Sequence, residues 1–182
     1  MKIDSTPFEG LFVLAPRVFA DERGYFFESF NELTFRQNNI DFNWVQDNQS
    51  SSKYGVIRGL HFQKPPYAQT KLIRVLQGEI LDVVVDLRHA SKTFGQSYSI
   101  VLSSQNHFQL LIPKGFAHGF SVLSVTADVM YKCDELYNKE SESGILFNDP
   151  KLGIDWKVDA DKMVVSSKDL TLPAFDRNEI IF

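Results

Sequence analysis

Short apolar runs, rich in β-branched and aromatic residues and separated by turn residues, fill the middle of the chain. Runs of this kind are typical of β-strands, and their spacing favours a sandwich or a barrel rather than a helical bundle. The predicted strands are Val56–Phe62, Lys71–Leu76, Glu79–Leu87, Ser97–Leu102, Phe108–Ile112, Gly119–Leu123 and Ala127–Cys133.

Turn and capping residues support this division of the chain. Gln77–Glu79 has a glycine at its centre and predicts a tight hairpin between two strands, and Pro113–Gly115 predicts a turn before the strand that follows His118. One early helix is expected over Asn31–Gln37, because Asn31 is a good N-cap and the next residue is acidic.

Alternation along the last predicted strand indicates which of its side chains face the interior. Successive side chains of a strand point to opposite faces, so every second residue shares a face. Tyr131 therefore points inward with the apolar set, and an inward phenol needs a polar partner. The inward set is Ala127, Val129, Tyr131 and Cys133, and the opposite set is Thr126, Asp128, Met130 and Lys132.

The same rule applied to the first predicted strand leaves the direction of one side chain undecided. Ile57, Gly59, His61 and Gln63 share a face, which places Arg58 on the opposite face. A bulge at Gly59 would re-aim Arg58, because a bulge inserts an extra residue and shifts the alternation. Parity alone does not decide between these two placements.

Length and charge limit what the chain can be. Its 182 residues suit a single domain, 1–182, with a barrel core over about 44–150. The net charge of −4 argues against a nucleic-acid partner. No apolar run is long enough to span a bilayer, so no membrane partner is expected. The single cysteine, Cys133, and the absence of a recognisable signal peptide predict a cytoplasmic protein.

Inward histidines in a β barrel raise the question of a metal. Cupin barrels supply two histidines separated by one residue, a carboxylate, and a third histidine from a Pro-x-Gly-x-x-His turn. The turn is present as Pro113–His118, but His61 is followed by Gln63, and Lys71 stands where a carboxylate would be needed. A protonated lysine repels a divalent cation. We therefore predict a cupin-like barrel that binds no metal.

Three side-chain types fit a different chemistry. Removing a proton beside a carbonyl requires a base, a cation for the developing enolate oxygen, and a separate acid that returns the proton. His61, Lys71 and Tyr131 match these three roles. The structural alternative is that Tyr131 is a core aromatic and Lys71 a solvated strand residue, and from the pattern alone the two interpretations are evenly matched.

Ordered motifs from near the N-terminus to about Pro173 identify a family. The chain closely resembles the dTDP-4-dehydrorhamnose 3,5-epimerases. The motifs that carry this resemblance are Asp21–Glu28, Gln46–Asn48, Val56–Gln63, Val84–Arg88, Ser91–Gly95, Ile112–Phe120, Tyr131–Cys133, Phe147–Trp156 and Ser167–Asp169. Residues 174–182 match nothing that we can assign.

The resemblance assigns roles residue by residue. It implies that His61 is the base, Asp169 the carboxylate that orients it, Tyr131 the proton donor and Lys71 the enolate-stabilising lysine. Tyr137 falls on the aromatic that stacks on thymine. The other implied ligand-binding residues are Arg23, Glu28, Gln46, Asp47, Asn48, Arg58, His118, Glu142 and Lys168.

The resemblance also implies an activity and an assembly. It predicts a cofactor-independent epimerase that inverts C3 and C5 of dTDP-4-dehydro-6-deoxy-D-glucose, a step in dTDP-L-rhamnose synthesis. It further implies a homodimer in which N-terminal strands are exchanged and part of each N-terminal region completes the neighbour's site. The alternatives are an epimerase that acts at only C3 or C5, a 3,4-ketoisomerase, a non-catalytic sugar-nucleotide binding protein, and a metal-dependent cupin oxygenase.

Overall fold

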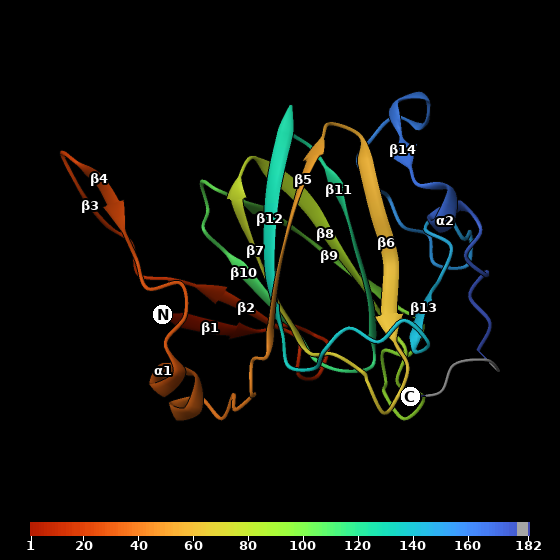
Figure 1. The fold of residues 1–182 in the computed structure, drawn as a ribbon, viewed down its shortest axis with the longest axis horizontal. Coiled ribbons are helices and arrows are strands. Elements are labelled where there is room, and N and C mark those ends of the chain that lie inside the picture. The colour runs from red at the N-terminus through yellow and green to blue at the C-terminus, as the bar shows by residue number, and fades with distance from the viewer. Residues whose placement is uncertain (178–181) are drawn as a thin grey trace.

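The computed structural model describes residues 1–177 and 182, and it confirms the mainly β fold (Figure 1). The predicted domain, 1–182, and the unassigned tail, 174–182, both include residues that lie outside this described part. Most strands belong to two large sheets that face each other across the core. Among the described residues, no helix is both long enough and apolar enough to cross a membrane.

The two sheets are antiparallel except at one edge. The first sheet has the order β1 (Lys2–Ser5), β2 (Phe12–Ala15), β10 (Gln109–Ile112), β7 (Lys71–Gln77), β12 (Thr126–Cys133) and β5 (Gln46–Lys53). The second has the order β13 (Glu142–Gly144), β6 (Val56–Gln63), β11 (Phe116–Val122), β8 (Glu79–Asp86) and β9 (Ser97–Ser103), and β14 (Val164–Val165) pairs in parallel with β6.

Each predicted apolar run contains a strand, with one shifted boundary and one missed neighbour. β11 begins at Phe116 rather than Gly119, so His118 lies within the strand instead of before it. β5 was not predicted because Gln46–Lys53 is polar throughout, although it pairs along its full length with β12. The β-propensity of its residues does not predict such a strand, because one of its faces lines a polar pocket instead of an apolar core.

The predicted hairpin at Gln77–Glu79 is present. Gly78 joins β7 to β8 with φ of +79°, a left-handed conformation that side chains other than glycine rarely adopt. A Cβ atom at this position would lie 2.1 Å from the carbonyl oxygen of Thr126. Both the backbone conformation and the close approach therefore require glycine.

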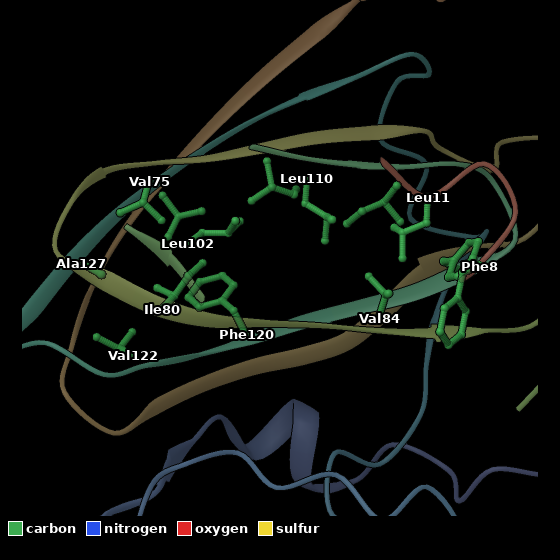
Figure 2. Packing of buried hydrophobic residues seen from close by; sticks show 14 residues of the cluster. Phe8, Leu11, Val75, Ile80, Val84, Leu102, Leu110, Phe120, Val122 and Ala127 are labelled. Atoms are coloured by element: carbon green, nitrogen blue, oxygen red, sulfur yellow. The ribbon is translucent and has the colours of Figure 1, made fainter. Parts of the chain in front are cut away.

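Apolar side chains from both sheets pack against one another between the sheets (Figure 2). Val75 and Ala127 from the first sheet meet Ile80, Val84 and Phe120 from the second in a single buried cluster. The inward face predicted for the last strand is confirmed, because Ala127 and Val129 belong to this cluster and Tyr131 packs against it. Burial of this surface supplies the main driving force for closing the two sheets.

Segments at both ends of the chain cover the outer faces of the sheets. Helix α1 (Glu32–Gln37) packs Phe35 against Leu72 and Leu111 on the first sheet. The predicted cap is confirmed, because the Asn31 side chain accepts a hydrogen bond from the backbone N–H of Thr34 at 3.1 Å. On the second sheet, the C-terminal segment packs over strands β6 and β8 and includes helix α2 (Ser167–Leu170).

A small hairpin stands away from the barrel. Strands β3 (Phe19–Asp21) and β4 (Gly24–Phe26) pair only with each other, and the hairpin projects into solvent beyond β1 and β2 (Figure 1). Its aromatic side chains are exposed, with Tyr25 at 60% and Phe26 at 67% of their full accessibility. Two strands alone bury too little surface to be stable, so this hairpin lacks the support that the barrel strands have.

Candidate active site

An open pocket lies between the two sheets, next to the apolar core. Its walls come from β5, β6, β7, β11 and β12, so both sheets contribute side chains. The lining residues are Asn48, Gln49, Ser50, Arg58, His61, Lys71, His118, Gly119, Phe120 and Tyr131. Six predicted site residues from separate sequence motifs therefore meet here. They are Asn48, Arg58, His61, Lys71, His118 and Tyr131.

A bulge on β6 decides where Arg58 points. Its partner strand pairs His118 with His61 and Phe120 with Arg58, so one residue of β11 opposes two residues of β6. Arg58 and His61 consequently both line the pocket, while Ile57 turns to the outer apolar cluster. The expectation that Ile57 and His61 share a face is wrong, because it assumed unbroken alternation.

Gly59 makes this bulge possible. Its φ is +121°, and a Cβ atom there would lie 2.6 Å from the Cα of Gly119 on the neighbouring strand. The backbone N–H of Gly59 also donates to Asp169 Oδ2 at 3.2 Å. The bulge thus directs Arg58 and His61 into the pocket, and its backbone helps to hold the Asp169 carboxylate.

That carboxylate forms a close pair with His61. Asp169 Oδ1 lies 2.7 Å from His61 Nε2, although the two residues are 108 positions apart. Asp169 is buried in α2, and the side chain of its N-cap, Ser166, accepts a hydrogen bond from the Asp169 backbone N–H at 3.1 Å. A carboxylate only accepts, so Nε2 carries the proton and Nδ1 is left as the basic nitrogen.

Burial and charge act in opposite directions on His61. Burial lowers the pKa of its imidazole, and the neighbouring Lys71 lowers it further. The hydrogen bond and charge of Asp169 raise the pKa, and so does Glu142 to a smaller degree. A neutral imidazole with a hydrogen-bonded carboxylate behind it is the arrangement expected of a general base.

Lys71 and Tyr131 occupy the facing wall. Lys71 Nζ lies 5.9 Å from the centre of the Tyr131 ring, on neighbouring strands β7 and β12. Burial lowers the pKa of Lys71 and raises that of Tyr131. Both side chains line the pocket, and both are partly buried there. A phenol can donate a proton and an ammonium can stabilise negative charge, so the two side chains suit these roles.

A second histidine–carboxylate pair lies deeper in the same pocket. His118 Nε2 is 2.9 and 3.0 Å from the two carboxylate oxygens of Asp82, which is completely buried. Burial raises the pKa of Asp82, and the charges of His118 and Lys71 oppose that rise. Sequence reasoning missed Asp82, although a carboxylate within the apolar stretch Ile80–Val85 was a usable signal.

Another group of predicted residues is joined by hydrogen bonds and is not part of the pocket lining. Glu142 accepts from Lys168 Nζ at 2.7 Å and from the Tyr137 hydroxyl at 2.9 Å. The backbone N–H of Tyr137 donates to Gln46 Oε1 at 3.0 Å. Because Lys168 directly precedes Asp169 in α2, one short helix contributes both to this hydrogen-bonded group and to the buried pair.

Three further predicted ligand-binding residues also lie outside the pocket lining. Arg23 is at the tip of the projecting hairpin and pairs with Asp21. Glu28 follows that hairpin and accepts from the Asn31 side chain at 3.0 Å. Asp47 is exposed and pairs with Lys132 at 2.9 Å. The single chain therefore assembles the chemical centre but leaves these residues outside it.

The arrangement suits proton transfer at a carbon between two walls. The base candidate, His61, belongs to the second sheet, and the donor candidate, Tyr131, belongs to the first. A ligand held between them has one group on each side. Within the described part of the chain, no cluster of three or more His, Cys, Asp or Glu side chains is placed to hold a metal ion.

Known proteins resemble this chain over nearly its whole length. The sequence profile of the family described as dTDP-4-dehydrorhamnose 3,5-epimerase matches residues 5–177. The enzyme of that name from Methanothermobacter thermautotrophicus is 49% identical over 165 residues, which cover 90% of this chain and 89% of the relative.

Solved structures agree in fold as well as in sequence. The crystal structure of dTDP-4-dehydrorhamnose 3,5-epimerase from Elizabethkingia anophelis superposes with a TM-score of 0.92 at 49% identity, covering 100% of this chain and 99% of the other. The Legionella pneumophila 3,5-epimerase, in complex with dTDP-4-keto-L-rhamnose, gives a TM-score of 0.92 at 44% identity, covering 99% and 94%.

Proposed function

The chain belongs to the dTDP-4-dehydrorhamnose 3,5-epimerase family, and on that premise we propose that it inverts C3 and C5 of dTDP-4-dehydro-6-deoxy-D-glucose. The product is dTDP-4-dehydro-L-rhamnose. The observation that carries this proposal is the His61–Asp169 pair, 2.7 Å apart, across the pocket from Lys71 and Tyr131. The relative from Legionella binds a sugar nucleotide of the same class.

The proposed chemistry follows from the substrate's C4 carbonyl. C3 and C5 both neighbour that carbonyl, so removing the proton from either one gives an enolate. His61 Nδ1 takes the proton, and the Lys71 ammonium stabilises the charge that develops on the carbonyl oxygen. Tyr131, on the opposite wall, returns a proton to the other face of the carbon, and this inverts the centre.

Asp169 serves this step without touching the substrate. By accepting from Nε2–H, it fixes the tautomer that leaves Nδ1 basic, and it stabilises the imidazolium that forms. The pKa of His61 is lowered mainly by burial, and Asp169 limits that fall. The base is therefore neutral near neutral pH but still basic enough to act.

The remaining assigned residues bind the rest of the sugar nucleotide in this proposal. Arginine and lysine suit the diphosphate, amides suit sugar and base edges, and an aromatic ring suits the thymine face. Tyr137 is exposed and is held by Gln46 and Glu142, so its ring is available to stack on the thymine. The residues proposed to bind are Arg23, Glu28, Gln46, Asp47, Asn48, Arg58, His118, Tyr137, Glu142 and Lys168.

The projecting hairpin supports a homodimer with exchanged N-terminal strands. It carries exposed Tyr25 and Phe26 together with Arg23, and it stands clear of its own pocket. In the proposed dimer it reaches the neighbour and brings Arg23 and Glu28 to that site. Sedimentation velocity should give a dimer, and a fully active monomer would contradict this assembly.

Solvent exchange tests the function directly. The purified protein is incubated with dTDP-4-dehydro-6-deoxy-D-glucose in deuterated water, and the sugar is followed by NMR. Deuterium at both C3 and C5 with formation of the L-sugar is expected. Exchange at one carbon would show the alternative single-carbon epimerase. Tight binding of the sugar nucleotide without any exchange would show a non-catalytic binding protein.

A further inference from the structure

We propose that Gln63 is a positioning residue for Tyr137, and that its side-chain amide holds the Tyr137 ring ready to receive the thymine of the substrate. This inference rests on the proposed function, in which Tyr137 stacks on that base. In the sequence, Gln63 stands where a metal-binding cupin barrel would carry a second histidine. In the structure it is buried, with 5% exposure, and both polar atoms of its amide have partners in nearby loops.

The amide of Gln63 holds the backbone on both sides of Tyr137. Its Oε1 accepts from the backbone N–H of Asn138 at 2.7 Å, and its Nε2 donates to the carbonyl oxygen of Leu136 at 3.2 Å. Asn138 and Leu136 are the two chain neighbours of Tyr137. One side-chain amide, accepting on one side and donating on the other, therefore fixes both the position and the orientation of this segment.

A third hydrogen bond fixes the amide itself. Gln63 Nε2 also donates to the carbonyl oxygen of Tyr67 at 2.7 Å, and Tyr67 belongs to a turn in which its N–H donates to the carbonyl oxygen of Lys64 at 3.1 Å. Both amide hydrogens and the amide oxygen of Gln63 are thus used, which locks the group in one orientation. Gln63 therefore ties the loop that follows β6 to the loop that carries Tyr137.

The Tyr137 ring is held at its tip as well. Its hydroxyl donates to Glu142 Oε2 at 2.9 Å, and Glu142 is the register partner of Gln63 between β13 and β6. Its backbone N–H donates to Gln46, whose Nε2 donates at 2.9 Å to Asn48 in the pocket wall. With 54% of Tyr137 exposed, its ring is fixed at both ends yet accessible. A preorganised surface of this kind binds without the cost of ordering a loop.

The position of Gln63 predicts an effect on affinity rather than on proton transfer. If the loop held the binding geometry for only about a tenth of the time, the apparent Kd for the nucleotide would rise about tenfold. The proposed base, His61, lies two residues away on the same strand and has its own partner in Asp169. Loss of the Gln63 amide should therefore weaken nucleotide binding and leave the chemical step in place.

Gln63→Met tests this role because it keeps the length of the side chain and removes the amide. Titration calorimetry with dTDP should show a rise in Kd of about fivefold to tenfold. KM for the sugar nucleotide should rise in parallel, with kcat within about twofold of wild type. A side chain that merely supported β6 would instead disturb His61 when replaced, and kcat would fall. An unchanged Kd for dTDP would show that the inference is wrong.

A double-mutant cycle tests whether Gln63 acts through the ring. In a Tyr137→Ala background, Gln63→Met should cause little further change in the Kd for dTDP, because the group that it positions is already gone. Two effects that add fully would mean that Gln63 acts on binding by another route, and the inference would fail.

Asn106→Leu is the matched control for general loss of stability. The Asn106 amide also makes three hydrogen bonds to backbone, donating to Val101 and accepting from Ser103 and Phe108, in the turn between β9 and β10. Its replacement should lower the melting temperature but leave the Kd for dTDP unchanged. A rise in Kd equal to that of Gln63→Met would show that lost stability alone weakens binding, and it would overturn the inference.

A measurement on the wild-type protein covers the case in which Gln63→Met does not fold. The Asn138 amide hydrogen should exchange with solvent more slowly than in an unstructured peptide of the same local sequence, because it is bonded to Gln63. Exchange as fast as in that peptide would overturn the inference without any variant. Failure of the wild type to bind dTDP would overturn the proposed function as well, whereas normal wild-type binding with an unchanged Kd in Gln63→Met would overturn the inference alone.

Discussion

In the described part of the chain, the histidines of two adjacent strands, β6 and β11, each contact a carboxylate, and the two pairs differ in their access to solvent. His61 retains 33% of its side-chain exposure while its partner Asp169 retains 5%. His118 retains 9% and Asp82 none. Each pair joins an imidazole to a carboxylate at hydrogen-bond distance, but the first pair is open to solvent and the second is nearly closed to it.

The difference in access separates their roles. His61 has one nitrogen held by Asp169 and a second that the pocket exposes, as proton transfer to a bound molecule requires. In the inner pair, Asp82 is completely buried and both of its oxygens contact His118. The outer pair therefore has the access that the proposed proton transfer needs, and the inner pair is largely closed to solvent.

The two carboxylates also reach their histidines by different routes. Asp82 comes from a strand of the barrel itself, paired with the strand that carries His118. Asp169 comes from a short helix outside the barrel, held by the Ser166 cap and by the Gly59 bulge. The outer pair therefore depends on the C-terminal segment, and the inner pair depends only on the sheet.

The largest expected effect is that of His61→Ala, which removes the base from the open pair. A general base contributes roughly 100- to 10,000-fold, so deuterium exchange into the substrate should fall by that amount. Tyr131→Phe is the matched comparison, because it removes only a phenolic proton. Tyr131→Phe should still allow proton removal while impairing stereospecific return. Near-wild-type exchange in His61→Ala would end the assignment of His61 as base.

Asp169→Asn should have the next largest effect and should act on the acidic limb of the pH profile. It keeps the side-chain volume, removes the charge that raises the pKa of His61, and permits the wrong tautomer. Since His61 must be neutral to act, its lower pKa moves the acidic limb of the profile towards lower pH. Turnover should fall by roughly 100-fold with little change in KM. Full activity with an unshifted profile would remove Asp169 from the mechanism.

Local sequence patterns predicted the secondary structure of the molecule better than the arrangement of its pocket. The Asn31 cap, the Gly78 turn and the inward face of the strand with Tyr131 follow from short-range rules, and the structure confirms them. These rules work because capping, turn geometry and side-chain alternation depend on near neighbours.

The parts of the site that sequence reasoning could not derive depend on exceptions to those rules. The bulge at Gly59 overturns alternation and brings Arg58 beside His61. Strand β5 is polar because it faces the pocket, so it carries no apolar signal. Asp169 is too far along the chain for any local pattern to pair it with His61, and only family resemblance suggested it.

The smallest expected effect is that of metal removal, and it follows from what both pairs have in common. His61 and His118 are direct register partners on β6 and β11, and both line the pocket. In each ring, however, Nε2 already contacts a carboxylate, and the Lys71 ammonium nearby repels a divalent cation. Dialysis against EDTA should therefore leave turnover and both limbs of the pH profile unchanged. A large loss that one particular divalent ion restores would mean that the two histidines serve as ligands rather than as partners of Asp169 and Asp82.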